Sequence, residues 1–352
     1  MKSKNLALNI LITCLATLFA LFAAELLLAL LHPIEHLRPS GARPDDNWRQ
    51  LLHRPSSIPG LAYELVPNQE KRAVGAMITT NSHGMRDAEP WADHPALYRI
   101  AVLGDSFTFG FRVAGETTYP AVLEDLLNRA SSEARFDVLN FGVGGYSTHD
   151  EALVLTHKAS TWNPALIILG YYFNDPETEP LQPLHRHYHQ PAWWQHFNLT
   201  RLVAWGWRRW EEIYHGGGDY YRFLHAPETE HWQSVLRAFA QIQRTANGLE
   251  APVLVVIFPV TQDRPWADYP YRDLHRQVAD AARAHGFHVL DLLGPFAERP
   301  GQELMARSWD NHPSVTGHAV AARAIQRWIV ANRAIVVARP TDRQENLVPY
   351  YP

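Results

Sequence analysis

The sequence predicts an α/β domain of three layers, in which helices cover both faces of a central parallel sheet of five strands. Short apolar runs rich in β-branched residues alternate with segments of helical periodicity, and the segments between runs are long enough for crossover helices. Strands that are apolar throughout are typical of parallel sheets buried between two helical layers. The strands predicted for this flavodoxin-like sandwich are residues 99–104, 136–141, 165–171, 252–258 and 287–292.

The composition is that of a globular chain with enough apolar residues for a full core. The chain has 352 residues, of which 46% are hydrophobic and 19% charged, and its formal net charge is −4. This balance argues against a disordered chain and against a nucleic-acid-binding protein. The only cysteine, Cys14, lies in an apolar N-terminal run. The rest of the chain therefore has no disulfide, thiolate nucleophile or cysteine-ligated metal, and we expect no cofactor and no metal.

Residues 6–31 form an almost wholly apolar run, and 26 helical residues would span roughly 39 Å, enough to cross a bilayer. A cleaved signal peptide has a shorter apolar region and a small-x-small site, so we expect an uncleaved transmembrane helix. A lipoprotein signal ending at Cys14 is a minor alternative. Basic residues flank the run on both sides and do not set its orientation. We expect a single-pass protein of the inner (cytoplasmic) membrane with a periplasmic domain, and Glu25 near the lipid interface without a helix partner.

The chain after residue 31 divides by composition into four further segments. Residues 32–60 are rich in proline with mixed charge, which predicts a tether between membrane and domain. Residues 61–95 are expected to form a hairpin-rich prelude, and residues 96–335 the α/β domain. Residues 336–352 lack periodicity and are expected to form a loose tail.

The segment at about 176–250, between the third and fourth predicted strands, is far longer than a crossover requires and contains half of the twelve tryptophans. We expect it to form a helical cap over the site. One helical face in it is apolar, and such a stripe favours a core-facing helix over a ligand platform. The residues of this stripe are Leu199, Val203, Trp207, Trp210 and Tyr214.

Four polar or glycine-rich blocks follow the predicted strands. Gly104-Asp105-Ser106 ends the first strand, residues 140–145 (Asn-Phe-Gly-Val-Gly-Gly) end the second, and Asn174-Asp175 follows the third. Asp310-Asn311-His312 precedes the last predicted helix. Because the carboxyl ends of parallel strands meet at one edge of the sheet, where α/β proteins bind ligands, we expect these blocks to converge.

In type and order these blocks resemble those of the SGNH (GDSL-like) hydrolase superfamily, over roughly residues 96–335. The resemblance implies that Ser106 is the nucleophile of a catalytic triad completed by Asp310 and His312. It also implies an oxyanion hole formed by the backbone N–H groups of Ser106 and Gly145 and the side-chain amide of Asn174. No metal or cofactor is implied.

In acyl transfer, His312 would accept the Ser106 proton as the serine oxygen attacks an ester carbonyl, and a carboxylate would hold the resulting imidazolium. The superfamily usually has its aspartate three residues before the histidine, whereas Asp310 is only two residues before His312. The sequence therefore leaves Asp291, after the fifth strand, as an alternative carboxylate for orienting His312.

We therefore expect a membrane-anchored serine esterase, a carboxylic ester hydrolase, that acts on an O-acetyl or other acyl ester of an envelope polysaccharide. The polysaccharide is suggested by residues 81–86 (Asn-Ser-His-Gly-Met-Arg), which resemble the pre-domain segment of membrane-anchored bacterial members. Three alternatives stay open: acyl transfer to a glycan hydroxyl, a lysophospholipase or thioesterase, and a catalytically silent glycan-binding assembly subunit. The expected partners are the acyl-ester substrate and the membrane, with no nucleic acid; the sequence does not predict an oligomeric state.

Overall fold

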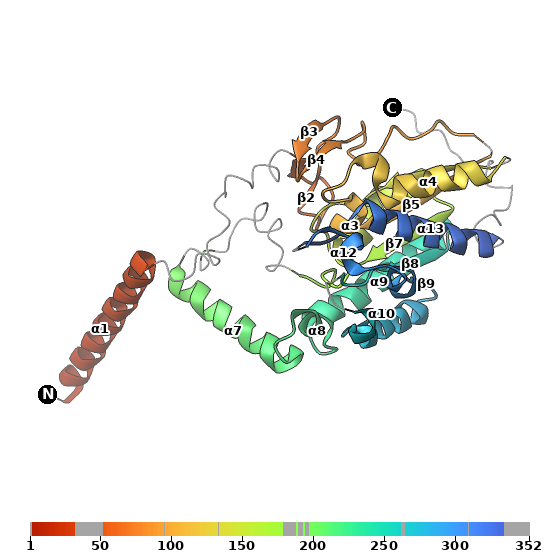
Figure 1. Ribbon diagram of the computed structural model, residues 1–352. Coiled ribbons are helices and arrows are strands. Elements are labelled where there is room, and N and C mark those ends of the chain that lie inside the picture. The colour runs from red at the N-terminus through yellow and green to blue at the C-terminus, as the bar shows by residue number, and fades with distance from the viewer. Residues whose placement is uncertain are drawn as a thin grey trace, which may run out of the picture.

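The computed structural model places most of the chain in one α/β domain and a helical arm (Figure 1). The residues it describes are 2–31, 52–94, 96–132, 134–178, 188, 193, 197–261, 265–308 and 310–333. The predicted tail, the first part of the predicted tether and much of the first part of the predicted cap lie outside the described residues.

A five-stranded parallel sheet forms the centre of the domain, in the order β6-β5-β7-β8-β9. This is the flavodoxin-like order, so the predicted fold and its strands are confirmed. All residues of β7 and β8 are buried, as expected for strands between two helical layers. The strands are β5 (Leu97–Gly104), β6 (Arg135–Asn140), β7 (Leu166–Tyr171), β8 (Val253–Ile257) and β9 (His288–Asp291).

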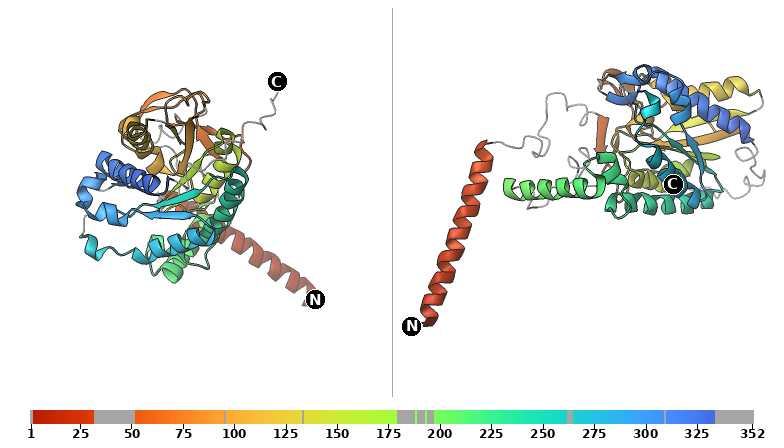
Figure 2. Two further views of the ribbon diagram at one scale, coloured as in Figure 1. Left: turned by 90° about the vertical axis from the view of Figure 1, so that its right-hand side faces the viewer. Right: turned by 60° about the horizontal axis from the view of Figure 1, so that its bottom comes forward.

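Helices cover both faces of this sheet (Figures 1 and 2). On one face α4 (Tyr119–Ala130) packs against α13 (Val315–Ala331), and on the other α5 (Thr148–His157) packs against α9 (Glu230–Leu249). Helix α10 (Arg272–Ala284) contacts β8 and β9. The connections contain α3 (Ser106–Phe109), η3 (Gly115–Thr117), η4 (Ala159–Trp162), α8 (Tyr220–His225), η6 (Trp266–Asp268), α11 (Leu293–Ala297) and α12 (Gly301–Leu304).

Three antiparallel strand pairs lie outside the central sheet. Before the domain, β1 (His53–Pro55) pairs with β2 (Tyr63–Leu65), and β3 (Glu70–Ala73) pairs with β4 (Ala76–Thr79). After β9, β10 (Met305–Arg307) pairs with β11 (Asp310–Pro313). The first two pairs and the segment after them lie against the domain, and the third carries two of the predicted site residues.

The helical arm consists of the N-terminal helix α1 (Lys2–Leu31) and of α7 (Asn198–Gly216), from the segment between β7 and β8. Within α1, residues Leu8–Leu30 are long and apolar enough to cross a membrane, with a mean hydropathy of 2.3. Near its end, the Glu25 carboxylate accepts hydrogen bonds from the Asn198 backbone N–H at 2.7 Å and the Leu199 N–H at 2.9 Å. The expectation that Glu25 has no helix partner is therefore wrong, because its carboxylate caps the exposed N–H groups at the start of α7.

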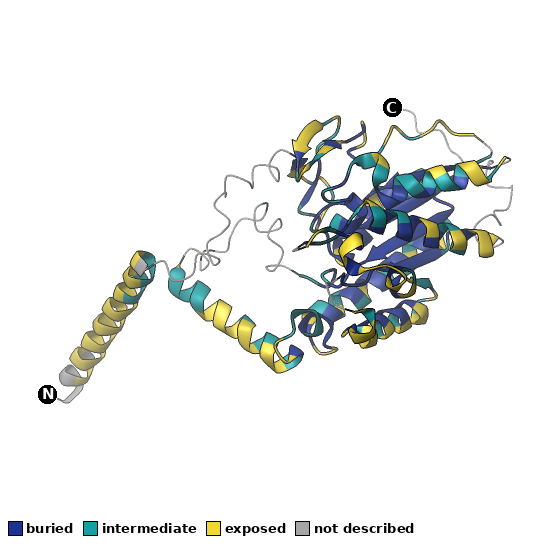
Figure 3. Cartoon of the chain, viewed as in Figure 1, coloured by how far each residue is buried: buried dark blue, intermediate teal, exposed yellow. Residues whose placement is uncertain are grey.

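Helix α7 extends away from the α/β domain, and its side chains are largely exposed (Figure 3). Val203, Trp207 and Tyr214 are 65%, 62% and 68% exposed, and Trp210 is 49% exposed. The prediction that this stripe faces the core is wrong, because α7 is not one of the helices that pack on the sheet.

Candidate active site

Ser106 lies at the carboxyl end of β5, as the first residue of α3. Asp105 caps this helix, and its carboxylate accepts a hydrogen bond from the Phe107 N–H at 2.8 Å. Gly104 has a φ of 156°, and a Cβ there would come within 2.0 Å of the Thr108 hydroxyl oxygen. Glycine at 104 therefore allows the tight turn that presents Ser106 at the sheet edge.

The structure brings Ser106, His312 and Asp310 together. The His312 Nε2 atom lies 2.8 Å from the Ser106 Oγ atom, and His312 Nδ1 is hydrogen-bonded to the Asp310 carboxylate. The backbone N–H of His312 also donates to Asp310 Oδ1 at 3.1 Å. Asp310 and His312 are two residues apart on β11, and such residues point to the same side of a strand. A short Asp-x-His spacing is therefore compatible with this contact.

Asp291, the alternative carboxylate, lies on a different histidine. Its Oδ1 atom is 2.8 Å from Nδ1 of His275, whose Nε2 atom is 2.9 Å from the Tyr269 hydroxyl. His275 and Tyr269 are buried. Of the two candidate carboxylates, Asp310 is the one in contact with His312.

Arg112 is a site residue that sequence analysis did not find. Its Nε–H donates to the second carboxylate oxygen of Asp310. Burial alone would raise the pKa of Asp310, but hydrogen bonds and charge from His312, together with the hydrogen bond from Arg112, hold that pKa well below its ordinary value. Arg112 and Asp310 are 198 residues apart in the chain, so no local spacing indicates their pairing.

The glycines after β6 lie beside the nucleophile. A Cβ on Gly144 would be 3.9 Å from the Ser106 Cβ, and Gly145 has a left-handed φ of 82° that favours glycine. The Gly144 carbonyl accepts a hydrogen bond from the buried Tyr63 hydroxyl at 3.0 Å. Strand β2 before the domain thus helps to fix this loop, while the role of the Gly145 N–H stays a prediction.

Asn174 follows β7 and hydrogen-bonds the Asp105 carboxyl, next to Ser106. Its own side-chain oxygen is buried and has no hydrogen-bond partner. Glu151 and Asp175 are buried acids, and burial together with repulsion from Asp105 raises the pKa of both well above the ordinary range. These two carboxyls therefore favour their neutral forms, which limits the negative charge behind the nucleophile.

Arg86 ties the segment before the domain to the nucleophile loop. It is 2% exposed, and its guanidinium donates to the carbonyls of Phe109 at 2.6 Å, Gly110 at 2.5 Å and Val113 at 2.5 Å. Burial lowers the pKa of Arg86 to about 10. In the sequence, residues 81–86 stand out only by resemblance, and this contact gives Arg86 a structural role.

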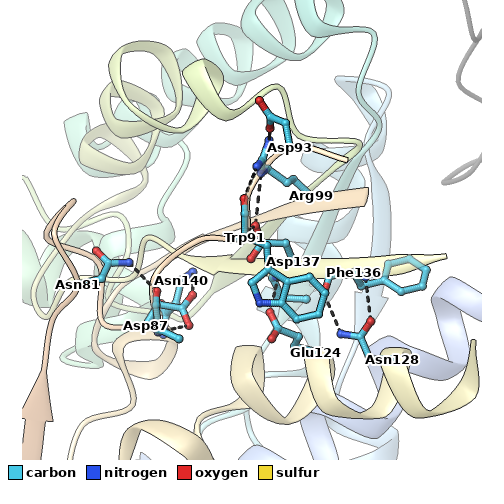
Figure 4. A network of polar contacts seen from close by, with 12 residues as sticks. Asn81, Asp87, Trp91, Asp93, Arg99, Glu124, Asn128, Phe136, Asp137 and Asn140 are labelled. Carbon is cyan, nitrogen blue, oxygen red and sulfur yellow. Dashed lines mark hydrogen bonds and ion pairs between the residues drawn. The ribbon is translucent and has the colours of Figure 1, made fainter. Parts of the chain in front are cut away.

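A polar network connects the same segment to β6 (Figure 4). The Asn140 N–H donates to Asp87 at 2.9 Å, and the Asn140 side chain bridges the Thr108 carbonyl at 3.1 Å and the Gly142 N–H at 3.0 Å. Asn140 thus joins the nucleophile helix to the glycine loop. Burial raises the pKa of Asp87 to about 7, against the hydrogen bond from Asn140.

The α/β domain matches the model of a known protein family. Residues 102–320 match the GDSL-like Lipase/Acylhydrolase family, and the chain belongs to this family. It is a carboxylic ester hydrolase of the GDSL/SGNH type. No curated protein matches the chain. Within the described parts of the chain, no three or more His, Cys, Asp or Glu side chains are grouped to hold a metal ion.

Solved structures of similar fold include several esterases. TesA is 13% identical, with 66% of this chain and 97% of that chain covered and a TM-score of 0.42. A mutant of Axe2, an acetylxylan esterase from Geobacillus stearothermophilus, is 18% identical, with 66% and 94% covered and a TM-score of 0.43. A two-domain esterase active on acetylated mannans is 17% identical, with 73% and 52% covered and a TM-score of 0.41. At this distance none of them indicates the substrate of this chain.

Proposed function

We propose that this protein is a membrane-anchored serine esterase in which Ser106, His312 and Asp310 form the catalytic triad. The observation that carries the proposal is the chain of hydrogen bonds from Asp310 through His312 to Ser106, with 2.8 Å between the last two side chains. Acyl transfer requires this arrangement, in which the nucleophile contacts a base and the base contacts an orienting carboxylate.

Catalysis begins when His312 accepts the Ser106 proton as the serine oxygen attacks the ester carbonyl. Asp310 stabilises the imidazolium that forms, and His312 then gives the proton to the leaving alcohol. Water, activated by the same imidazole, hydrolyses the acyl-enzyme and regenerates Ser106. The N–H groups of Ser106 and Gly145 and the Asn174 amide serve as donors to the oxyanion of both tetrahedral intermediates.

The acyl group that we propose is small, an O-acetyl group on an envelope polysaccharide. Aromatic rings flank the imidazole: the Phe111 ring centre is 4.5 Å from that of His312, and the Phe107 ring centre is 5.4 Å away. Tyr172 stacks on Phe107 at 4.0 Å. These rings support the proposal of a narrow acyl site. The resemblance of residues 81–86 to membrane-anchored bacterial relatives supports the proposal of a polysaccharide substrate.

We further propose that α1 stays attached as an anchor in the inner membrane, with the α/β domain in the periplasm. The length and hydropathy of α1 support a membrane span. Its Glu25 caps α7 with three hydrogen bonds, including one from the Asn198 side chain at 2.8 Å. Cleavage of α1 would remove this cap.

The proposal is tested by ester hydrolysis with the full-length protein, using p-nitrophenyl acetate, butyrate and octanoate. We expect the highest kcat/KM with acetate, and loss of turnover in Ser106→Ala but not in the matched control Ser160→Ala in η4. Equal activity in Ser106→Ala and wild type would refute the nucleophile. A preference for octanoate would refute the small acyl group.

A further inference from the structure

We propose that α7 lies along the lipid–water interface of the membrane that α1 crosses, with one face among the lipid headgroups. This face, called the aromatic face below, consists of Val203, Trp207, Trp210, Ile213 and Tyr214. The inference goes beyond the esterase activity and does not depend on it, but it rests on the proposed membrane span of α1.

The aromatic face is an unusually apolar surface for a helix outside the core. Its five side chains are between 49% and 68% exposed, and their spacing places them on one side of α7. The ring centres of Trp207 and Trp210 are 5.1 Å apart, and those of Trp210 and Tyr214 are 5.0 Å apart. Continuous exposed apolar surface of this kind marks a site of contact with a protein or a membrane.

The position of α7 favours the membrane. Its first turn is held by Glu25, close to the end of the apolar window Leu8–Leu30. In Figure 1 and in the right-hand view of Figure 2, α7 runs crosswise to α1, and the α/β domain lies beyond α7. If α1 crosses the bilayer, a helix that leaves its end crosswise runs along the bilayer surface.

The residue types on the two sides of α7 fit the same location. Tryptophan and tyrosine are enriched at membrane–water interfaces, where an apolar ring and a polar N–H or O–H are both accommodated. The opposite side of α7 carries Arg208 and Glu212, and Glu212 forms an ion pair with Arg209 at 2.7 Å. An amphipathic helix with aromatic residues on one side and arginines on the other is typical of helices that lie in the interface.

The active site lies on the side of the domain that faces the helical arm. In Figure 1, the sheet edge that carries α3, and with it Ser106, is turned toward α7 and α1. With α7 on the lipid surface, that edge is held on the membrane side of the domain.

The test measures the depth of α7 in full-length protein reconstituted into nanodiscs of phosphatidylcholine and phosphatidylglycerol. A nitroxide label on the native Cys14 reports on α1. In a Cys14→Ser background, labels on Val203→Cys and Tyr214→Cys report on the aromatic face, and labels on Ala204→Cys and Arg208→Cys serve as matched controls. Electron paramagnetic resonance compares accessibility to oxygen, which enters lipid, with accessibility to a water-soluble nickel chelate.

We expect the ratio of oxygen to nickel accessibility at 203 and 214 to be several-fold higher than at 204 and 208, and lower than at Cys14. Equal ratios on both sides of α7, with Cys14 in the bilayer, would overturn the inference. The aromatic face would then be a surface for water-soluble ligands such as glycans. Low accessibility to both reagents at 203 and 214 would overturn it in favour of a protein partner. A water-exposed Cys14 would overturn it together with the anchor, whereas the esterase assay would be unaffected.

Discussion

Helices α7 and α9 come from the same insertion, and both have one apolar side, yet they end in opposite environments. In α9, Trp232, Val235, Phe239 and Ile242 are buried. Helix α9 packs on α5, and the Phe239 ring contacts Tyr171 of β7. In α7, residues with nearly the same spacing, Val203, Trp207, Trp210 and Tyr214, are exposed. Amphipathic periodicity therefore identifies the apolar side of a helix. What that side packs against depends on where the tertiary fold places the helix.

The two helices also differ in what they contribute to folding. Burying a large apolar side chain stabilises the fold by roughly 1.5–3 kcal/mol, and α9 gains this contribution at several positions. The largely exposed rings on α7 gain little of it. We therefore expect variants in the α/β domain to change activity or stability, and variants of the aromatic face to change membrane contact alone.

The largest expected effect is at Asp310, inside the domain. Asp310→Asn removes the charge that orients and stabilises His312, so we expect kcat to fall by a factor on the order of 10⁴. Asp291→Asn is the matched control. Because Asp291 contacts His275 and not His312, this variant should keep most of the activity. The measurement is p-nitrophenyl acetate hydrolysis by both variants, and a larger loss in Asp291→Asn would reverse the assignment.

The next largest expected effect is the difference in unfolding free energy between a variant of α9 and a variant of α7. Trp232 in α9 is 5% exposed, so Trp232→Ala leaves a cavity in the core. We expect a loss of about 3–5 kcal/mol in the free energy of unfolding. Trp207→Ala in α7 should change it by no more than about 0.5 kcal/mol. Urea unfolding in detergent measures both, and similar losses in the two variants would show that α7 is packed against protein.

A smaller effect is expected for the oxyanion hole. Asn174→Ala removes one of three proposed donors, which we expect to lower kcat by about 10²–10³-fold with little change in KM. Asn332→Ala, at the end of α13, provides the control. Activity within a few fold of wild type in Asn174→Ala would mean that the amide only supports Asp105.

The mildest effect concerns pH. The pKa of Asp87 is about 7 in the folded state, above its unfolded value, so the folded state retains a proton that the unfolded state has released. This contribution to stability is fully present below about pH 4 and is lost as the pH rises to about 7, at roughly 1.4 kcal/mol per pH unit at most. We expect Asp87→Asn to remove that slope and the exposed-site control Asp93→Asn to retain it. Urea unfolding at pH 5 to 8 measures the slopes, and parallel slopes for wild type and Asp87→Asn would contradict the shift.

Local chemistry explains what could be predicted from the sequence. The five strands are runs of β-branched and apolar residues, and the four polar blocks lie next to them, so their convergence follows from parallel topology. Contacts between distant segments could not be predicted in this way. Arg112 meets Asp310, Arg86 meets the Phe109 carbonyl, and Glu25 meets Asn198 only because the tertiary fold brings them together. The exposure of α7 could not be predicted for the same reason, because the spacing of its apolar residues is nearly that of a buried helix.

The most direct test of the central claim is covalent labelling of the full-length protein with a fluorophosphonate probe, which reacts with an activated serine. Mass spectrometry should find one adduct, on Ser106, formed far more slowly in His312→Gln and at the wild-type rate in Trp207→Ala. The absence of an adduct on Ser106, or an unchanged labelling rate in His312→Gln, would contradict the proposed activation of Ser106 by His312.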